Sequence, residues 1–146
     1  MAEQIIRGNQ TISGAYGTLW LNNEKVMELK SVEAKVTAER TDVQLGLSID
    51  SKITGLKGEG SITVDKVYTR GKKLLEDWLK GKDTRSRIVT SIQDPDAVGK
   101  GEERVSIDNV WFNAIDLAKF TRGEVVEEEL PFGFTPEDVK YENAIK

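Results

Sequence analysis

The side chains available for chemistry in this chain are carboxylates, amines, amides and hydroxyls, because its 146 residues include no histidine and no cysteine. Histidine is the commonest general base and the commonest metal ligand. Ser-His-Asp, Cys-His and His-metal chemistry are therefore excluded in their usual forms. The lack of cysteine also excludes a disulfide framework and a thiolate metal site. We expect no catalytic residue, no cofactor, and a protein that is not an enzyme.

Two short segments resemble ligand sites, and both have an ordinary structural explanation. Residues 55–60 (GLKGEG) resemble a phosphate-binding loop, but they lack the Gly-Lys-Ser/Thr ending and no helix follows directly. A flexible strand or a bulge explains them better. Asp94 and Asp96, with Glu102 and Glu103, could hold a hard cation. Their spacing is not that of an EF-hand, so we predict an ordinary loop and no metal.

The length and composition predict a single domain that covers residues 1–146. Domains commonly run ~100–150 residues, and a chain of this size can bury about 70% of its unfolded surface. No stretch approaches the ~20 apolar residues of a membrane span, and the first residues lack the apolar centre of a signal peptide. We therefore expect a soluble protein with no membrane anchor that stays in the cytoplasm when it is synthesised.

The charges are distributed unevenly along the chain, although the net charge is only −4. Residues 66–87 contain eight basic and three acidic residues, a balance of +5. Residues 101–146 contain eleven acidic and five basic residues, a balance of −6. Either these are two solvated faces of a monomer, or the basic part of one molecule meets the acidic part of a neighbour. The second alternative gives these candidate contact residues: Arg70, Lys72, Lys73, Glu127, Glu128 and Glu129.

Residues 103–135 carry the clearest pattern and predict a β-hairpin with a polar, glycine-containing break at residues 121–124. Side chains alternate between the two faces of a strand, and in the second arm one face is apolar. The apolar residues that share this face are Val126, Leu130, Phe132 and Phe134. Such a face needs a cover, which could come from the chain's own core or from another subunit. In the first arm Trp111 and Phe112 are adjacent, so one of them must leave the main apolar face.

The rest of the pattern predicts further strands and one helix. Strands are expected at residues 16–21, 24–41, 52–67 and 86–92. The second of these needs a bulge near Lys30 and Ser31, where the apolar residues change parity. A helix at about residues 69–80 has Thr69 as its N-cap and ends at Gly81. This order predicts a mainly β (α+β) fold, an antiparallel sandwich or barrel with one helix packed on its side.

Three segments have no sustained pattern. They are an N-terminal arm at residues 1–14, a protruding loop or hairpin tip at residues 41–51, and a polar C-terminal tail at residues 136–146 with a helical turn at its start. The middle segment still contains apolar side chains, which are Val43, Leu45, Leu47 and Ile49. We hypothesise that this segment is mobile in a free subunit and becomes ordered against a neighbouring subunit or ring.

Taken together, four stretches resemble the tail tube proteins of contractile phages. They are NQTISGAYGTLWLNNEKV, GSITVDKVYTRGKKLLEDWLKG, GKGEERVSIDNVWFNAIDL and EVVEEELPFGFT, in the same order as in that family. The resemblance runs from about residue 9 to residue 135. It points to the tube proteins of PBSX-type (XkdM-like) defective prophages and of phage-tail-like bacteriocins.

The resemblance implies a β-sandwich or barrel-like subunit that assembles into hexameric rings, which stack into a hollow tube. Strands of the subunits would join into a continuous inner barrel, in which Glu127, Glu128 and Glu129 could form a negative wall. The implied partners are further copies of the chain, the tail sheath protein, and the tape-measure and baseplate proteins, with DNA only as passing cargo in a true phage. The implied location is the virion tail or bacteriocin particle, assembled in the cytoplasm of the bacterial host.

Two rival interpretations remain at the level of the sequence. The same fold class would serve as the tube of a type VI-like contractile secretion system. A small monomeric β-domain that binds a carbohydrate or a protein is the alternative from a different functional class. A tube protein would form rings or filaments at high concentration, whereas a monomeric binding module would not.

Overall fold

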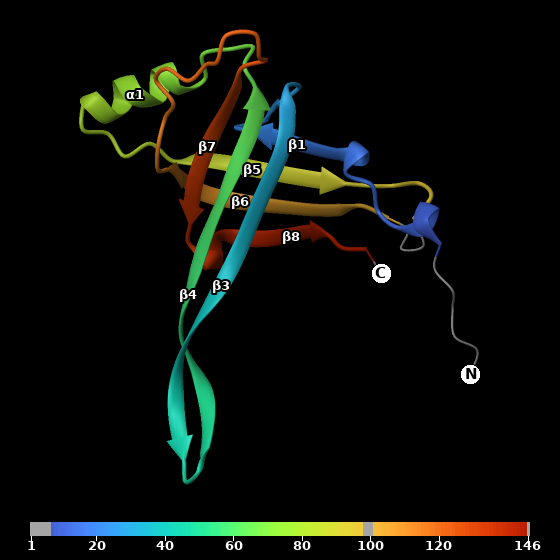
Figure 1. Cartoon of the computed structure of the whole chain (residues 1–146), viewed down its shortest axis with the longest axis vertical. Helices are drawn as coiled ribbons and strands as arrows, with labels where there is room; N and C mark the ends of the chain where they lie inside the picture. Colours follow the sequence, from blue (N-terminus) through green and yellow to red (C-terminus); the bar gives the residue numbers. More distant parts are fainter. Residues whose placement is uncertain (1–6, 98–100, 146) are drawn as a thin grey trace.

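The computed structural model describes residues 7–97 and 101–145, and within them the chain is mostly antiparallel β-structure (Figure 1). The strands are β1 (Gly17–Leu21), β2 (Glu24–Lys25), β3 (Leu29–Leu45), β4 (Ser48–Asp65), β5 (Ser86–Ile92), β6 (Glu103–Phe112), β7 (Glu127–Phe134) and β8 (Val139–Asn143). The helices are α1 (Gly71–Leu79) and the short 3₁₀ turns η1 (Gly8–Gln10), η2 (Gly14–Tyr16) and η3 (Pro136–Asp138). The predicted fold class, mainly antiparallel β-structure with few helices, is confirmed.

The strands form two layers that cross one another. Their order is β2-β1-β5-β6-β7-β4-β3, and β8 pairs with residues 104–107 of β6, on the edge opposite β5. In Figure 1 the β3, β4 and β7 group runs across the β1, β5, β6 and β8 group. The two groups join through β6 and β7, which pair only at Trp111 with Gly133 and Phe112 with Phe132. The sheet therefore turns a corner there, and the core lies between the two layers.

The alternation predicted for β7 is present in the core. Leu130, Phe132 and Phe134 are between 1% and 5% exposed, and the edge of the Phe112 ring meets Phe132 at a centroid distance of 6.4 Å. Phe112 is buried, whereas Trp111 faces outward beneath the Arg85 guanidinium, 4.8 Å from its ring centroid. The adjacent aromatic residues of β6 thus occupy opposite faces, as the sequence predicts.

The predicted hairpin over residues 103–135 is formed only in part, since β6 and β7 pair antiparallel at just two positions. Strand β6 ends at Phe112, residues 113–126 are irregular, and β7 pairs along its length with β4 instead. The short β6–β7 ladder ends with the bond from the Asn113 N–H to the Pro131 carbonyl, because Pro131 has no N–H with which to continue it. A strand-like sequence pattern predicts an extended segment, but it does not identify the strand with which that segment pairs.

Residues 41–51 form the tip of the long β3–β4 ribbon, so of the two predicted alternatives, a protruding loop or a hairpin tip, the hairpin tip is confirmed. Both strands continue through this segment to a two-residue turn, in which Gly46 has a φ of +65°. The alternation was not recognisable because neither face of the ribbon is covered here, so apolar residues need not keep one parity. The predicted bulge at Lys30 is confirmed by a register shift between Leu29 and Ser31.

Residues 55–60 lie in β4, which confirms the strand interpretation of the glycine-rich stretch. Gly58 and Gly60 let the rings of Phe134 and Phe132 approach the strand closely. A Cβ atom at Gly58 would lie 2.5 Å from the Phe134 ring, and one at Gly60 would lie 2.6 Å from Phe132 Cζ. These glycines therefore serve the core.

Helix α1 is shorter than predicted. Its N-cap position is Arg70 instead of Thr69, and no side chain caps it. The Arg70 side chain is turned toward Glu28 instead. The end at Gly81 is confirmed, since this residue has a φ of +77° and donates its N–H to the Trp78 carbonyl at 2.9 Å.

The C-terminal segment is not only a tail. The expected helical turn is η3, but residues Val139–Asn143 then form β8 against β6. Ser106 donates to Glu142 across this pair at 3.1 Å. The strand is short and mostly polar, so its own sequence contains little signal. At the other end of the chain, residues 1–6 of the predicted arm lie outside the described residues, and Ser13 donates its N–H to Asp94 at 2.9 Å.

Candidate functional site

The acidic loop considered as a cation site uses its carboxylates for internal bonds. Asp94 is 6% exposed and accepts hydrogen bonds from the Ser13 and Asp96 N–H groups, each at 2.9 Å. Hydrogen bonds to Glu102, foremost from Arg104, lower the pKa of this carboxyl to about 2. In the part of the chain that the structure describes, no three acidic side chains gather closely enough to hold a metal ion.

An open cleft of about 760 Å³ lies between the two layers. Its walls are mostly apolar and come from the core-facing sides of β3, β5, β6, β7 and β8. Val36 and Tyr141 lie at its exposed margin, and Glu103 is the acidic residue in its lining. Two amines also line it: Lys30 is paired with Glu127, and Lys35 lies within 4.0 Å of Glu33 and of Glu59. The cleft is thus an opening of the sandwich whose lysines face carboxylates outside its lining.

The apolar residues predicted as contacts lie at the far end of the β3–β4 ribbon. Their exposed fractions are 39% for Val43, 59% for Leu45, 71% for Ile49 and 107% for Leu47. The ribbon carries them away from the rest of the subunit (Figure 1), so none of them contributes to the core. An isolated pair of strands is marginally stable in water. The exposed end therefore lacks the packing that normally supports such a ribbon.

The three consecutive glutamates of β7 have different environments. Glu127 is ion-paired with Lys30, and Glu129 is exposed on the polar face. Glu128 is only 2% exposed and accepts a hydrogen bond from Lys66 Nζ at 3.1 Å. It is thus an internal residue of the subunit, unlike the wall position assigned to it from the sequence. Its parity is that of Leu130, which is the signal by which sequence reasoning could have found it.

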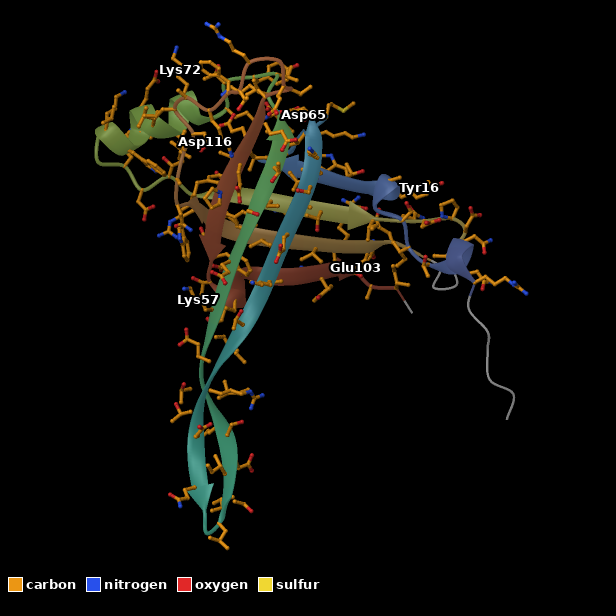
Figure 2. The ribbon with its side chains drawn as sticks, viewed as in Figure 1. Tyr16, Lys57, Asp65, Lys72, Glu103 and Asp116 are labelled. Carbon is orange, nitrogen blue, oxygen red and sulfur yellow. The ribbon has the colours of Figure 1, made fainter. Side chains whose placement is uncertain are left out.

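The three basic candidates also separate into two groups. Arg70 pairs with Glu28, whose side chain is 5% exposed, and the hydrogen bond from Arg70 lowers the pKa of Glu28. Lys72 and Lys73 are exposed on α1, and Lys72 points away from the strands (Figure 2). These two lysines therefore belong to a free surface, whereas Arg70 stabilises the subunit itself.

Part of the charge complementarity expected between molecules is satisfied within one molecule. Lys66 with Glu128, and Arg87 with Asp108, each join the basic segment at residues 66–87 to the acidic C-terminal part. The Arg87–Asp108 distance is 3.2 Å, and both side chains are about half exposed. A surface pair such as Arg87–Asp108 contributes little to stability, so it leaves these two charges available to other partners.

The described helices have no role as membrane spans. None of the helices in residues 7–97 and 101–145 is long and apolar enough to cross a lipid bilayer.

Comparison with known proteins identifies the family. The family model described as "Phage tail tube protein" matches residues 4–141. The chain belongs to this family. It is 31% identical over 137 residues to the phage-like element PBSX protein XkdM of Bacillus subtilis (strain 168), covering 92% of this chain and 93% of the relative. The resemblance seen in the sequence is thereby confirmed.

Solved structures show the same fold at low sequence identity. The tube-terminating cap of the anti-feeding prophage has a TM-score of 0.66 at 11% identity, covering 97% of both chains. The sheath–tube complex of the extracellular contractile injection system PVC, in its extended state, also gives 0.66, at 12% identity, with 92% of this chain and 93% of the other covered. The tail tube fold is therefore retained where few residues are shared.

This member of the tail tube family has a second exposed apolar surface that sequence reasoning missed. We call it the helix-bearing end, because it lies beside α1, opposite the ribbon turn (Figure 1). Seven large apolar side chains there are 62–80% exposed: Met27, Val67, Tyr68, Leu79, Leu117, Phe120 and Val125. Leu117, Phe120 and Val125 lie within the arms of the predicted hairpin, but residues 113–126 form no strand in the structure. Their exposure was hidden by that incorrect assignment.

Proposed function

We propose that this chain forms the inner tube of a contractile phage tail or a phage-tail-like bacteriocin, by stacking of hexameric rings. Family membership supports a structural role in a tail tube. The prophage origin of the XkdM relative supports a defective prophage or bacteriocin as the particle. The likeness to a tube chain within a sheath–tube complex supports a contractile particle.

The observation that carries the proposal is the open edge of β3. This strand is 17 residues long, stands at the end of the strand order, and pairs on one side only, with β4. No other described strand covers its second edge. Long open edges promote pairing with another chain, and closure into a ring removes them. Copies of the chain arranged in a ring would complete the edge and line a lumen with their strands.

The surfaces of the subunit fit assembly both around a ring and between stacked rings. The tip residues Val43, Leu45, Leu47 and Ile49, the exposed Lys72 and Lys73, and Glu127 and Glu129 remain the candidate contacts between subunits and rings. Ring-on-ring stacking is a heterologous contact, so the two ends of the subunit must differ and complement one another. The proposed partners are the tail sheath, tape-measure and baseplate proteins. DNA would be passing cargo only, and the protein would have no enzymatic activity.

A type VI-like or related contractile injector is the second candidate. The likeness to the PVC tube chain favours it, because that tube belongs to an extracellular contractile injection system. The neighbouring genes separate the two candidates. Tail sheath and tape-measure genes are expected for a phage or bacteriocin, and secretion ATPase genes for the alternative.

The experiment is electron microscopy of the assembled protein together with a shortened ribbon. Concentrated protein, supplied with its baseplate initiator, should form hollow tubes. In the variant, an Asn-Gly turn replaces residues 41–52 and joins the paired residues Arg40 and Ile53. The removed residues are all exposed, so the subunit should still fold but form no tubes. Normal tubes from the variant would exclude the ribbon contact, and a mature particle without this chain would exclude the function.

A further inference from the structure

The end of the ribbon has two apolar faces, as its strand register shows. We use "ribbon end" for residues 40–53. In an antiparallel ladder, directly paired residues share a face and neighbouring residues alternate. Val43 pairs with Asp50 and Leu45 with Ser48, so Val43 and Leu45 lie on the first face. Gln44 pairs with Ile49 and Arg40 with Ile53, so Ile49 and Ile53 lie on the second face.

Neither face is covered by the subunit. Exposed fractions are 39% and 59% for Val43 and Leu45, and 71% and 49% for Ile49 and Ile53. A ribbon that lay flat on one neighbour would bury one face, and its other face would be expected to be polar. Two apolar faces instead require a cover on both sides. This pattern differs from that of the same strands nearer the core, where Glu33 and Lys35 occupy the outer face.

We propose that the ribbon end is inserted into a groove between two other copies of this chain, which bury one face each. This inference rests on the proposed tube function, and it identifies the surface of the other copies that the ribbon end contacts. The groove is formed where the helix-bearing ends of two adjoining copies meet. Its walls would be the exposed apolar side chains of that end, such as Leu117 and Phe120.

Charge and position favour a copy of this chain as the occupant. The charged residues of the ribbon end, Arg40, Asp42, Asp50 and Lys52, sum to zero. A neutral surface has no electrostatic attraction for nucleic acid, whose binding depends on phosphate neutralisation. The ribbon turn and the helix-bearing end lie at opposite ends of the longest axis of the subunit (Figure 1). Identical units stacked head to tail bring these two ends together.

The test compares the two faces by matched double variants. They are Val43→Thr/Leu45→Thr for the first face and Ile49→Thr/Ile53→Thr for the second. Threonine keeps a high strand propensity while reducing apolar area. Each variant should raise the protein concentration needed for tube formation about tenfold or more, because each removes apolar burial at every contact. The melting temperature of the subunit should stay unchanged, since all four side chains are exposed.

A control variant changes one polar residue on each face, Thr41→Ser with Gln44→Ser, and should assemble like the wild type. If one double variant assembles normally and the other does not, the ribbon lies flat and the insertion is wrong, although the tube function stands. If the wild type itself forms no tubes with its initiator, the tube function fails instead.

A cross-link identifies the groove. The chain has no native cysteine, so introduced thiols are the sole sites for a short bis-maleimide linker. In assembled tubes Leu47→Cys should link to Leu117→Cys of another copy. Linkage instead to Tyr141→Cys, at the margin of the cleft between the layers, would place the ribbon end in that cleft and overturn the assigned groove.

Discussion

A single methyl group added at Gly60 tests the packing on which the ribbon depends. A Cβ atom there would lie 2.2 Å from the Glu33 backbone oxygen and 2.6 Å from Cζ of Phe132. Favourable contacts between carbon atoms lie at about 3.5–4.0 Å. The first clash is with the backbone of β3, which no side-chain rotation relieves. The second is with a ring that is 1% exposed and surrounded by the core.

The expected magnitude for Gly60→Ala follows from these two contacts. Overpacking typically costs about 1–3 kcal/mol, and the rigidity of both neighbours places this variant near about 3 kcal/mol. The unfolding entropy is about 2.1 cal/mol/K per residue, or roughly 0.3 kcal/mol/K for 146 residues. The melting temperature of the purified subunit should therefore fall by about 10 °C.

Gly55→Ala is the matched control, since it makes the same change in the same strand. A Cβ atom there would have its nearest neighbour, a carboxylate oxygen of Glu39, at an ordinary 3.8 Å. Alanine is preferred to glycine within a strand by about 0.5 kcal/mol, so this variant should melt about 1–2 °C higher than the wild type. Thermal unfolding by circular dichroism measures both. Equal shifts for the two variants, or an unchanged Gly60→Ala, would refute the close approach of β4 to β3.

Two further predictions concern the buried ion pairs. Lys66→Met leaves the Glu128 carboxylate buried without its partner and should cost about 3 kcal/mol in urea unfolding. Adding Glu128→Leu should recover most of this loss, and a double variant as unstable as the single one would contradict the argument. The hydrogen bond from Arg70 lowers the pKa of Glu28 below 4.5, so the folded state binds fewer protons than the unfolded state. This stabilisation is present above about pH 4.5 and is lost as the pH falls through the folded pKa. The Arg70→Gln variant should have a lower free energy of unfolding than the wild type at neutral pH, and this free energy should fall less than that of the wild type between about pH 6 and pH 3. Equal falls in the two proteins would argue against a role of the Arg70–Glu28 pair in the pH dependence.

Local signals predicted the parts of the fold that depend on neighbouring residues. The β7 alternation holds because one face meets the core along the whole strand. Between β1 and β2, Asn22 and Asn23 have φ values of 51° and 70°, a conformation that asparagine tolerates better than most residues. Gly81 ends helix α1 because its positive φ is a conformation that glycine adopts readily. In each case the physical cause acts within a few residues, so the sequence is sufficient.

Pairing and exposure depended on contacts between distant segments. The partner of β7 is β4, more than sixty residues earlier in the chain, and the short β8 is identified by its ladder with β6. Glu128 was predicted as a contact residue although its parity is that of the apolar face, and only the position of Lys66 explains how its charge is accommodated there.

For this tail tube protein, the sequence by itself determined the absence of histidine and cysteine chemistry, the β-rich class and the family resemblance. These follow from composition and from periodic patterns along the chain. The tertiary structure decided that residues 41–51 extend a ribbon with two exposed apolar faces, and that a second apolar surface lies at the opposite end. The type of an apolar residue does not reveal whether its side chain is buried in its own subunit or exposed for contact with another copy. Exposure is therefore a property of the folded surface, which the sequence alone does not give.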